Sequence, residues 1–269
     1  MAVDWTLTEG RMRGGRPGTG LGVTSARAML GRLSAAFEMA VDDGKLPRNP
    51  CRKVRVSGGA KAPRATWNEE QVKRFITAVS ADRLAAVWLL SLLGLRRGEV
   101  CGLKWADVSF TDKTLSIRQT HVAVGGEVIE KGPKSRRGYR TLPLFQPVLG
   151  ALEQLSTAQL AEKAAAGAAY AGDVDSGFVC CDELGQPVHP EWWSSEFGRL
   201  CRAAGLPKIR LHDCRHSTNS LLEHLGVSPS IRASWFGHTI AVNTATYTHA
   251  SAADLEVIST ALGDIFKAV

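Results

Sequence analysis

The sequence lacks an apolar run long enough to cross a bilayer. Its longest apolar stretch, Leu84–Leu95, is interrupted by Ser91 and Gly94, whereas a transmembrane helix needs about 20 predominantly apolar residues. The N-terminus also lacks an apolar signal core, because Asp4 and Glu9 stand beside a stretch rich in glycine and arginine. We therefore expect no membrane association and a cytoplasmic location.

Cysteine is present, but not in the spacing that binds metal. The six cysteines lie at positions 51, 101, 180, 181, 201 and 214, and none forms a CxxC pair. A chain of 269 residues can build a core without disulfide staples. We expect reduced thiols in a cytosolic protein. The chain also has no internal repeat of useful period.

What the chain does have is an ordinary apolar content and a basic excess. It is 44% hydrophobic and 22% charged, and 33 Lys and Arg residues outnumber 26 Asp and Glu residues, which gives a net charge of +7. Such an excess suits a polyanionic partner such as nucleic acid. A solvated basic surface without any such partner explains it equally well.

A change of composition near residue 50 predicts two domains. A helix is predicted over Thr24–Asp43, and the polar, Pro/Gly-rich stretch Asn49–Arg64 predicts a linker. The predicted domains are residues 1–58 and 59–269. The apolar side chains of the predicted helix recur every four residues: Met29, Leu33, Phe37 and Val41.

The second part is predicted to be mainly α with a small antiparallel β-sheet. Thr66 and Glu69 fit the capping box of a helix, and Leu84–Leu93 is apolar all round, which predicts a buried helix. The apolar period changes to two over residues 115–144, where Gly125–Gly126 suits a hairpin turn. Five further helices are predicted at 146–165, 190–204, 212–225, 229–236 and 252–267.

Several polar residues stand out, and each has an ordinary explanation when taken alone. Arg96 and Glu99 could form a surface helix pair, and Lys134 could be a solvated loop lysine. His212 has a cysteine and a histidine nearby, but no metal-binding spacing such as HExxH accompanies them. A tyrosine near the C-terminus, here Tyr247, is usually a half-buried core residue.

Together these residues meet the requirements of metal-free phosphoryl transfer by a tyrosine. Two guanidiniums can clamp the non-bridging oxygens of a phosphodiester transition state, which an ammonium does less well. A phenol has an ordinary pKa of about 10, so it needs a nearby base or local positive charge to attack. The leaving 5′-oxygen needs a proton donor. The candidates in chain order are Arg96, Lys134, His212, Arg215, His238 and Tyr247.

Over Thr66–Ala250 the chain resembles the tyrosine recombinase (phage integrase) family. LLGLRRGEVCGLKWADV is similar to the family's first arginine box, which implies that Arg96 is the first catalytic arginine and Glu99 its supporting carboxylate. LHDCRHS resembles the HxxR box and implies catalytic roles for His212 and Arg215.

Two further motifs complete the resemblance. GPKSRRGYRTLPL is similar to the lysine box, with Lys134 nine residues before Pro143 and Lys131 as a less fitting substitute. WFGHTIAVNTATYTHAS carries His238 and, nine residues on, the nucleophile Tyr247. The basic residues around the lysine box expected to contact DNA are Lys131, Arg136 and Arg137.

The resemblance implies both a fold and a reaction. The fold is a mainly α catalytic domain with a small antiparallel sheet, preceded by a helical core-binding domain, and the two form a C-shaped clamp on duplex DNA. The reaction is site-specific cleavage and rejoining of DNA through a 3′-phosphotyrosyl intermediate and a Holliday junction. Neither a metal nor another cofactor is implied.

The implied partners are double-stranded DNA attachment sites, further copies of the chain, and accessory excision or host factors in a bacterium or its prophage. Four copies would assemble on paired sites. The tail at residues 251–269 resembles an exchange helix that docks in trans on a neighbouring protomer. Its apolar face at helical spacing also suits docking on its own core.

One departure concerns the N-terminal part. Residues 24–56 resemble only the last part of a core-binding domain, so we expect an N-terminal truncation through an internal start, a degraded gene or trimming. Two alternative functions follow. One is a non-catalytic DNA-binding remnant, and the other is a type IB topoisomerase-like enzyme, which shares the Arg, Lys, His and Tyr chemistry but needs no tetramer.

Overall fold

A computed structural model describes residues 22–58, 65–133, 135–172, 177–237 and 251–267. The chain divides into two compact units, Met1–Pro63 and Arg64–Val269. The interpretation of the first unit as part of a core-binding domain stays a prediction.

The first unit contains helix α2 (Val23–Asp42) and the 3₁₀ turn η1 (Pro50–Lys53). The Asn49 amide nitrogen donates to the main chain of α2 at 2.9 Å, and Arg27 of that helix donates to the Val56 carbonyl at 3.1 Å. The linker predicted from residue 49 onward is therefore wrong for its first part. Residues 49–56 pack on α2 because these hydrogen bonds hold an otherwise polar, irregular segment.

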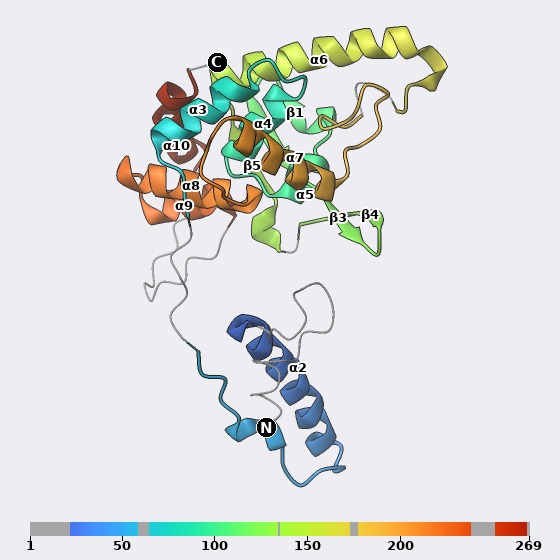
Figure 1. The fold of residues 1–269 in the computed structure, drawn as a ribbon, viewed down its shortest axis with the longest axis vertical. Coiled ribbons are helices and arrows are strands. Elements are labelled where there is room, and N and C mark those ends of the chain that lie inside the picture. Colours follow the sequence, from blue (N-terminus) through green and yellow to red (C-terminus); the bar gives the residue numbers. More distant parts are fainter. Residues whose placement is uncertain (1–21, 59–64, 134, 173–176, 238–250, 268–269) are drawn as a thin grey trace. The chain divides into compact units, whose positions relative to one another are not determined.

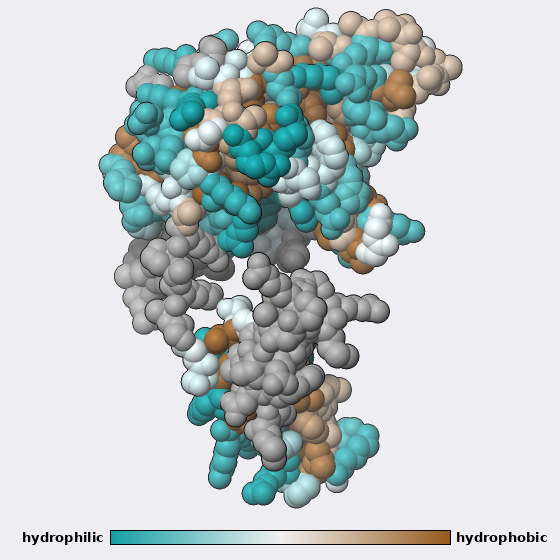
Figure 2. All heavy atoms as spheres, in the orientation of Figure 1, coloured by the Kyte–Doolittle hydropathy of each residue, from teal (hydrophilic) through white to brown (hydrophobic). Residues whose placement is uncertain are grey.

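Much of the apolar surface of α2 stays exposed. Met29, Leu33 and Met39 are 45%, 47% and 69% exposed, and Ala26 is the buried residue of the helix. Brown side chains on the surface of this unit are visible in Figure 2. Hydrophobic periodicity in α2 thus predicts the helix, but the described part of the unit supplies no core for it to cover.

The second unit begins with α3 (Glu69–Val79), whose N-terminal cap differs from the prediction. The capping box is formed by Asn68 and Gln71, which bond each other's main-chain N–H at 2.9 and 3.0 Å, and not by Thr66. Trp67 explains the difference. The Trp67 ring is buried, and the main-chain N–H of Trp67 donates to the Ser217 hydroxyl of α8 at 2.9 Å. The chain therefore stays extended through this position.

Helix α4 (Ala85–Leu92) is the buried helix that the sequence predicts, because all of its residues from Ala86 onward are buried. It ends before Gly94, which has φ +87°, a left-handed conformation that favours glycine. The chain turns there and restarts as α5 (Arg97–Cys101).

The strands form two antiparallel sheets where one was expected. A three-stranded sheet has the order β1-β2-β5, and a separate hairpin pairs β3 with β4 around the predicted glycine turn. The sheets separate after β2, since β2 pairs with β1 and β5 whereas β3 pairs with β4. Between β2 and β3, the side-chain amide of Gln119 donates to the Gly102 carbonyl at 2.8 Å. The strands are β1 (Val108–Ser109), β2 (Thr114–Ile117), β3 (Thr120–Val124), β4 (Glu127–Lys131) and β5 (Arg140–Pro143). The short 3₁₀ turns of this unit are η2 (Trp105–Asp107), η3 (Arg136–Gly138) and η4 (Gly167–Ala169).

The remaining helices lie within one residue of their predicted ends. They are α6 (Gln146–Ala166), α7 (Pro190–Ala203), α8 (Leu211–His224), α9 (Pro229–Phe236) and α10 (Ala252–Phe266). Figure 1 shows α6 extending past the rest of the unit, and α10 beside α3. The mainly α fold with small antiparallel sheets is as predicted. No helix in the described parts of the chain is long and apolar enough to span a membrane.

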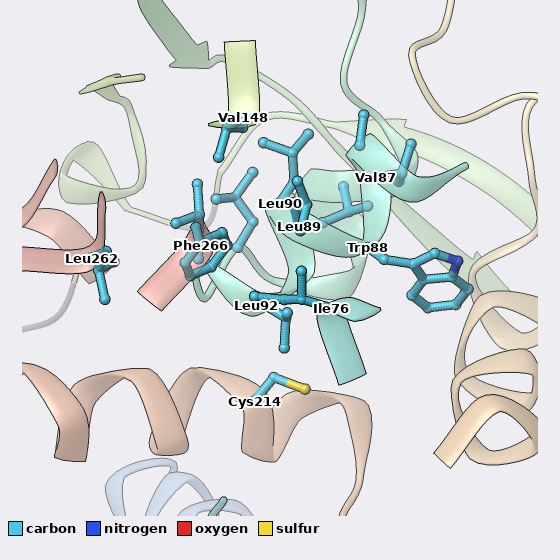
Figure 3. Packing of buried hydrophobic residues seen from close by; sticks show 14 of the residues in the cluster. Ile76, Val87, Trp88, Leu89, Leu90, Leu92, Val148, Cys214, Leu262 and Phe266 are labelled. Atoms are coloured by element: carbon cyan, nitrogen blue, oxygen red, sulfur yellow. The ribbon is translucent and has the colours of Figure 1, made fainter. Parts of the chain in front are cut away.

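The core of this unit is built around α4. Trp88 of α4 stacks on Trp193 of α7 with ring centroids 3.5 Å apart. From the opposite side, Phe266 of α10 and Val148 of α6 lie against the α4 leucines (Figure 3). Phe266 also meets Phe145 edge-on at 5.4 Å. In this single chain, α10 therefore packs on its own core.

Candidate active site

Three of the six predicted catalytic residues lie in the part of the chain that the structure describes. Arg96 caps the N-terminus of α5, and Arg215 lies on α8 one turn after His212. The other three, Lys134, His238 and Tyr247, lie outside the described residues. The supporting carboxylate Glu99 is in the first turn of α5.

Arg96 and Glu99 form a close, partly buried pair. The Arg96 main-chain N–H donates to Glu99 Oε2 at 2.8 Å, and its Nη1 donates to Oε1 at 2.6 Å. The Glu99 side chain is 3% exposed and that of Arg96 is 38% exposed. A surface helix pair is therefore the wrong description, because the carboxylate is in the interior and only the guanidinium reaches solvent.

Arg140, the first residue of β5, is a second partner of Glu99 that the sequence analysis missed. Its Nη1 and Nη2 donate to the two carboxylate oxygens at 3.1 and 2.9 Å. Burial opposes ionisation of Glu99, but Arg140 and then Arg96 outweigh it and hold the pKa of the carboxyl below its usual value. A signal was available, because Arg140 shares a strand face with the buried Leu142 two residues on.

Arg215 is buried, with 2% of its surface exposed. Its Nη1 donates to the Gly94 carbonyl at 2.7 Å, and its guanidinium lies 4.8 Å from the centre of the Phe236 ring. A side chain at position 94 would collide with that ring, since a Cβ there would lie 2.5 Å from it. Burial, then the charges of Arg96 and Arg140, lower the pKa of Arg215. An anion bound here would offset that penalty.

The three arginines also converge on the end of α9, where they donate to three consecutive main-chain carbonyls. The carbonyls at the end of a helix have no partner within it, and cations are favoured there. Arg96 and Arg215, which are predicted to act on a phosphate, thus also hold the main chain up to Gly237, the residue before position 238. The pairs are Arg140 Nε with Trp235 O (2.7 Å), Arg215 Nη2 with Phe236 O, and Arg96 Nη2 with Gly237 O (3.3 Å). We call Arg96, Glu99, Arg140 and Arg215 the arginine cluster.

His212 is exposed at the N-terminus of α8. Its ring meets that of His216 edge-on, with centroids 5.3 Å apart. Desolvation, then the charges of His216 and Arg215, lower the pKa of His212 below its usual value, against the opposing charge of Asp213. The surroundings therefore favour the neutral imidazole, the form that can accept a proton.

A hollow of about 250 Å³ opens beside Arg96 and Glu99. The β3 strand and the segments on either side of position 134 line the rest of it, including Lys131. Arg136 and Arg137, in η3, are exposed nearby in sequence. Within the described residues, no three His, Cys, Asp or Glu side chains are grouped so as to hold a metal ion.

Comparisons with known proteins agree with this arrangement. The family model described as "Phage integrase family" matches residues 66–254, more than two thirds of the chain. A tyrosine recombinase XerC-like protein of Caldanaerobacter subterraneus is 30% identical, over 83% of this chain and 61% of that protein. The ICEBs1 integrase of Bacillus subtilis is 28% identical, over 77% of this chain and 56% of its own length.

Solved structures show the same fold. The Tn1549 transposon integrase, in complex with transposon right end DNA, superposes with a TM-score of 0.69 at 20% identity. That match covers 92% of this chain and 76% of the integrase chain. A lambda integrase dimer bound to a COC' core site gives a TM-score of 0.52 at 19% identity, over 85% and 76% of the two chains.

The fold and the match to the family model agree with each other. The chain belongs to the phage integrase family, and it spans about 60% of the length of the curated relatives it matches.

Proposed function

We propose that this chain cleaves and rejoins DNA at specific sites as a tyrosine recombinase. The observation that carries the proposal is the arginine cluster, in which Arg96 and Arg140 share the Glu99 carboxylate and both of them, with Arg215, donate to main-chain carbonyls at the end of α9. Membership of the family supports it, and so do the structural relatives, which were solved on transposon and core-site DNA.

In the proposed reaction, the Tyr247 oxygen attacks the scissile phosphorus and the bond to the 5′-oxygen breaks. The products are a 3′-phosphotyrosyl bond and a 5′-hydroxyl, and the reverse reaction with a second strand rejoins the DNA. Lys134 donates the proton that the leaving 5′-oxygen takes up. His212 and His238 are the candidates for accepting the proton of the phenol and for bonding the phosphate.

The guanidiniums of Arg96 and Arg215 stabilise the charge that develops on the non-bridging oxygens. Preorganised donors in a water-poor site act more strongly on such charge than the same groups in water. The burial of Arg215 and the fixed geometry around Glu99 supply this preorganisation. No step in this scheme needs a metal ion, because the cations of the chain do that work.

The proposed substrate is a double-stranded DNA attachment site, and the proposed working form is four copies of the chain on two such sites. Accessory excision or host factors would set the direction. Each copy would donate α10 to its neighbour in this assembly. The packing of α10 in cis supports this in one respect, since the same apolar surface would receive a neighbour's identical helix.

A nicked suicide substrate tests the proposal. Duplexes from the DNA flanking the gene, nicked close to the cleavage position, lose the short strand after attack, so the covalent adduct accumulates. We expect an adduct on a denaturing gel in the presence of EDTA. Binding without any adduct would favour the DNA-binding remnant, and relaxation of plasmids without site preference would favour the topoisomerase.

A further inference from the structure

The ion pair between Arg140 and Glu99 is the most enclosed one around the site. The two side chains are 7% and 3% exposed, and two parallel hydrogen bonds of 3.1 and 2.9 Å join them. Charges are costly to remove from water unless they are paired and hydrogen-bonded. This pair is therefore a fixed feature of the folded unit.

The Glu99 carboxylate serves two guanidiniums at once. Oε1 accepts from Arg96 Nη1 at 2.6 Å as well as from Arg140 Nη1, and Oε2 accepts from the Arg96 N–H at 2.8 Å as well as from Arg140 Nη2. One negative charge balances only one of two positive charges. The group of three thus keeps an excess positive charge, and Arg96 is its most exposed member, with 38% of its side chain exposed against 7% for Arg140 and 3% for Glu99.

Arg140 also joins the three segments that surround the exposed face of Arg96. Its Nε donates to the Trp235 carbonyl at the end of α9 (2.7 Å), and its Nη1 donates to the Gly138 carbonyl at the end of η3 (3.1 Å). A single side chain thereby links α5, the η3 turn within the lysine box, and the residues just before position 238.

We propose that Arg140 is a positioning residue for phosphodiester cleavage. Arg140 balances the negative charge of Glu99, so the positive charge of Arg96 stays available to interact with the scissile phosphate. This inference rests on the proposed function. Arg140 touches neither the phosphate nor the reacting atoms in this account. It acts through Glu99 and Arg96.

The competing explanation is that Arg140 only stabilises the fold. The two accounts differ in what happens when Glu99 also loses its charge. Without Arg140, Glu99 pairs with Arg96 alone and cancels its charge, which slows cleavage. Removing both charges frees Arg96 again, whereas a purely structural account expects the second substitution to add to the damage or leave it unchanged.

The experiment measures single-turnover adduct formation on the nicked suicide substrate, at saturating full-length protein, for wild type, R140Q, R140K, E99Q and the double variant E99Q/R140Q. We expect R140Q to cleave about 10–100-fold more slowly, the range found when groups that orient a metal's ligands are removed. R140K keeps the charge and is expected to retain most of the rate. The double variant is expected to cleave faster than R140Q.

Arg83 offers a matched control, because it forms a bidentate pair with Glu162 at 2.6 Å for each bond, away from the cluster. R83Q removes the same chemistry from a half-buried pair, so it measures the effect of lost stability alone. We expect R83Q to lower the melting temperature and to leave the cleavage rate of the folded fraction near that of wild type.

A double variant as slow as R140Q or slower would overturn the inference, as would R140K as impaired as R140Q. If R140Q fails to fold, R140K and the double variant are compared with wild type instead, and a folded R140K that cleaves about 10-fold more slowly or worse, which is the defect expected of R140Q, overturns the inference. A wild-type chain that forms no adduct on any flanking DNA would instead overturn the proposed function, and this inference with it.

Discussion

Two regions of the second unit are held in contrasting ways. In the arginine cluster, directional hydrogen bonds and charges hold α5, β5, α8 and the end of α9 around one buried carboxylate. Under α10, mainly apolar side chains cover the surface that we call the α10 seat, with one buried hydrogen bond from the Ser259 hydroxyl to the Pro143 carbonyl at 3.4 Å. The side chains that cover it are Leu255, Ile258, Leu262, Ile265 and Phe266.

The difference lies in what each region tolerates. Removing one member of a buried charged network leaves the others unpaired, so its arrangement is all but fixed. Apolar burial is non-directional, so a second copy's α10 can satisfy the seat as well as the chain's own. We therefore expect chemistry and assembly to be separable by substitution. The following predictions test this separation.

The largest effect is expected at the leaving group. Lys134→Ala is predicted to slow cleavage by about 10²–10⁴-fold, the usual contribution of a general acid. A 5′-bridging phosphorothiolate should remove most of this defect, because sulfur leaves without a proton. Equal defects on both substrates would mean that Lys134 only holds DNA. The same pair of substrates, applied to Lys131→Ala, decides between the two lysines.

The next largest effect is expected at the clamp. Arg96→Lys and Arg215→Lys are each predicted to slow cleavage by about 10²–10³-fold, because an ammonium cannot restore the two-pronged geometry. Single-turnover rates measure this, and gel shifts check that assembly on paired sites is unchanged. Near-normal rates in either variant would refute the clamp, and lost assembly would break the separation.

A smaller and different effect is expected at the α10 seat. Phe266→Ala is predicted to weaken cooperative assembly on paired sites and to spare single-site binding and cleavage. Deletion of the residues after Ala250 should do the same more strongly. A gel shift that resolves one, two and four bound copies provides the measurement.

The same variants distinguish exchange from docking in cis. A deletion that unfolds the chain would show that α10 serves its own core, and normal higher complexes would show that no exchange occurs. A melting curve without DNA separates these outcomes. Phe266 is fully buried in cis, so some loss of stability is expected, up to about 3–5 kcal/mol for such a truncation.

The smallest effect concerns pH. Desolvation and the charges of His216, Arg215 and Arg210 favour neutral His212, and Asp213 opposes them. We expect cleavage to require the neutral imidazole, so the rate falls as pH drops through its lowered pKa. His216→Gln removes one charge that disfavours protonation of His212, so it should raise the pKa of His212. The acid limb of the profile of cleavage rate against pH should then move to higher pH. An acid limb that does not move would exclude His212 as the titrating group.

Much of the fold was predictable because its signals are local. The all-apolar stretch before Gly94 predicts α4, and helix spacing predicts α6 to α10 to within one residue at each end. The capping box at residue 66 was wrong because Trp67 is drawn into the core by contacts distant in sequence. The split into two sheets was also missed, because alternation along the chain gives the strands but not which strands pair.

The site was predictable only in part, because some of its contacts join residues that are distant in sequence. Motif spacing selects Arg96, Glu99, His212 and Arg215, and the structure brings the two arginines and Glu99 into one cluster with Arg140. Strand alternation places Arg140 on the buried face of β5, but its partner could not be predicted, because it pairs across the fold with a residue 41 positions away. The catalytic roles of all six candidates stay predictions, and Lys134, His238 and Tyr247 also lie outside the described residues.

The most direct test of the central claim is the identity of the amino acid joined to DNA. The adduct from the nicked substrate is digested with protease and nuclease, and its peptides are analysed by mass spectrometry. We predict a nucleotide remnant on the peptide containing Tyr247, and no adduct with Tyr247→Phe, which should still bind DNA. A remnant on any other residue, or an adduct that persists in Tyr247→Phe, would contradict the account.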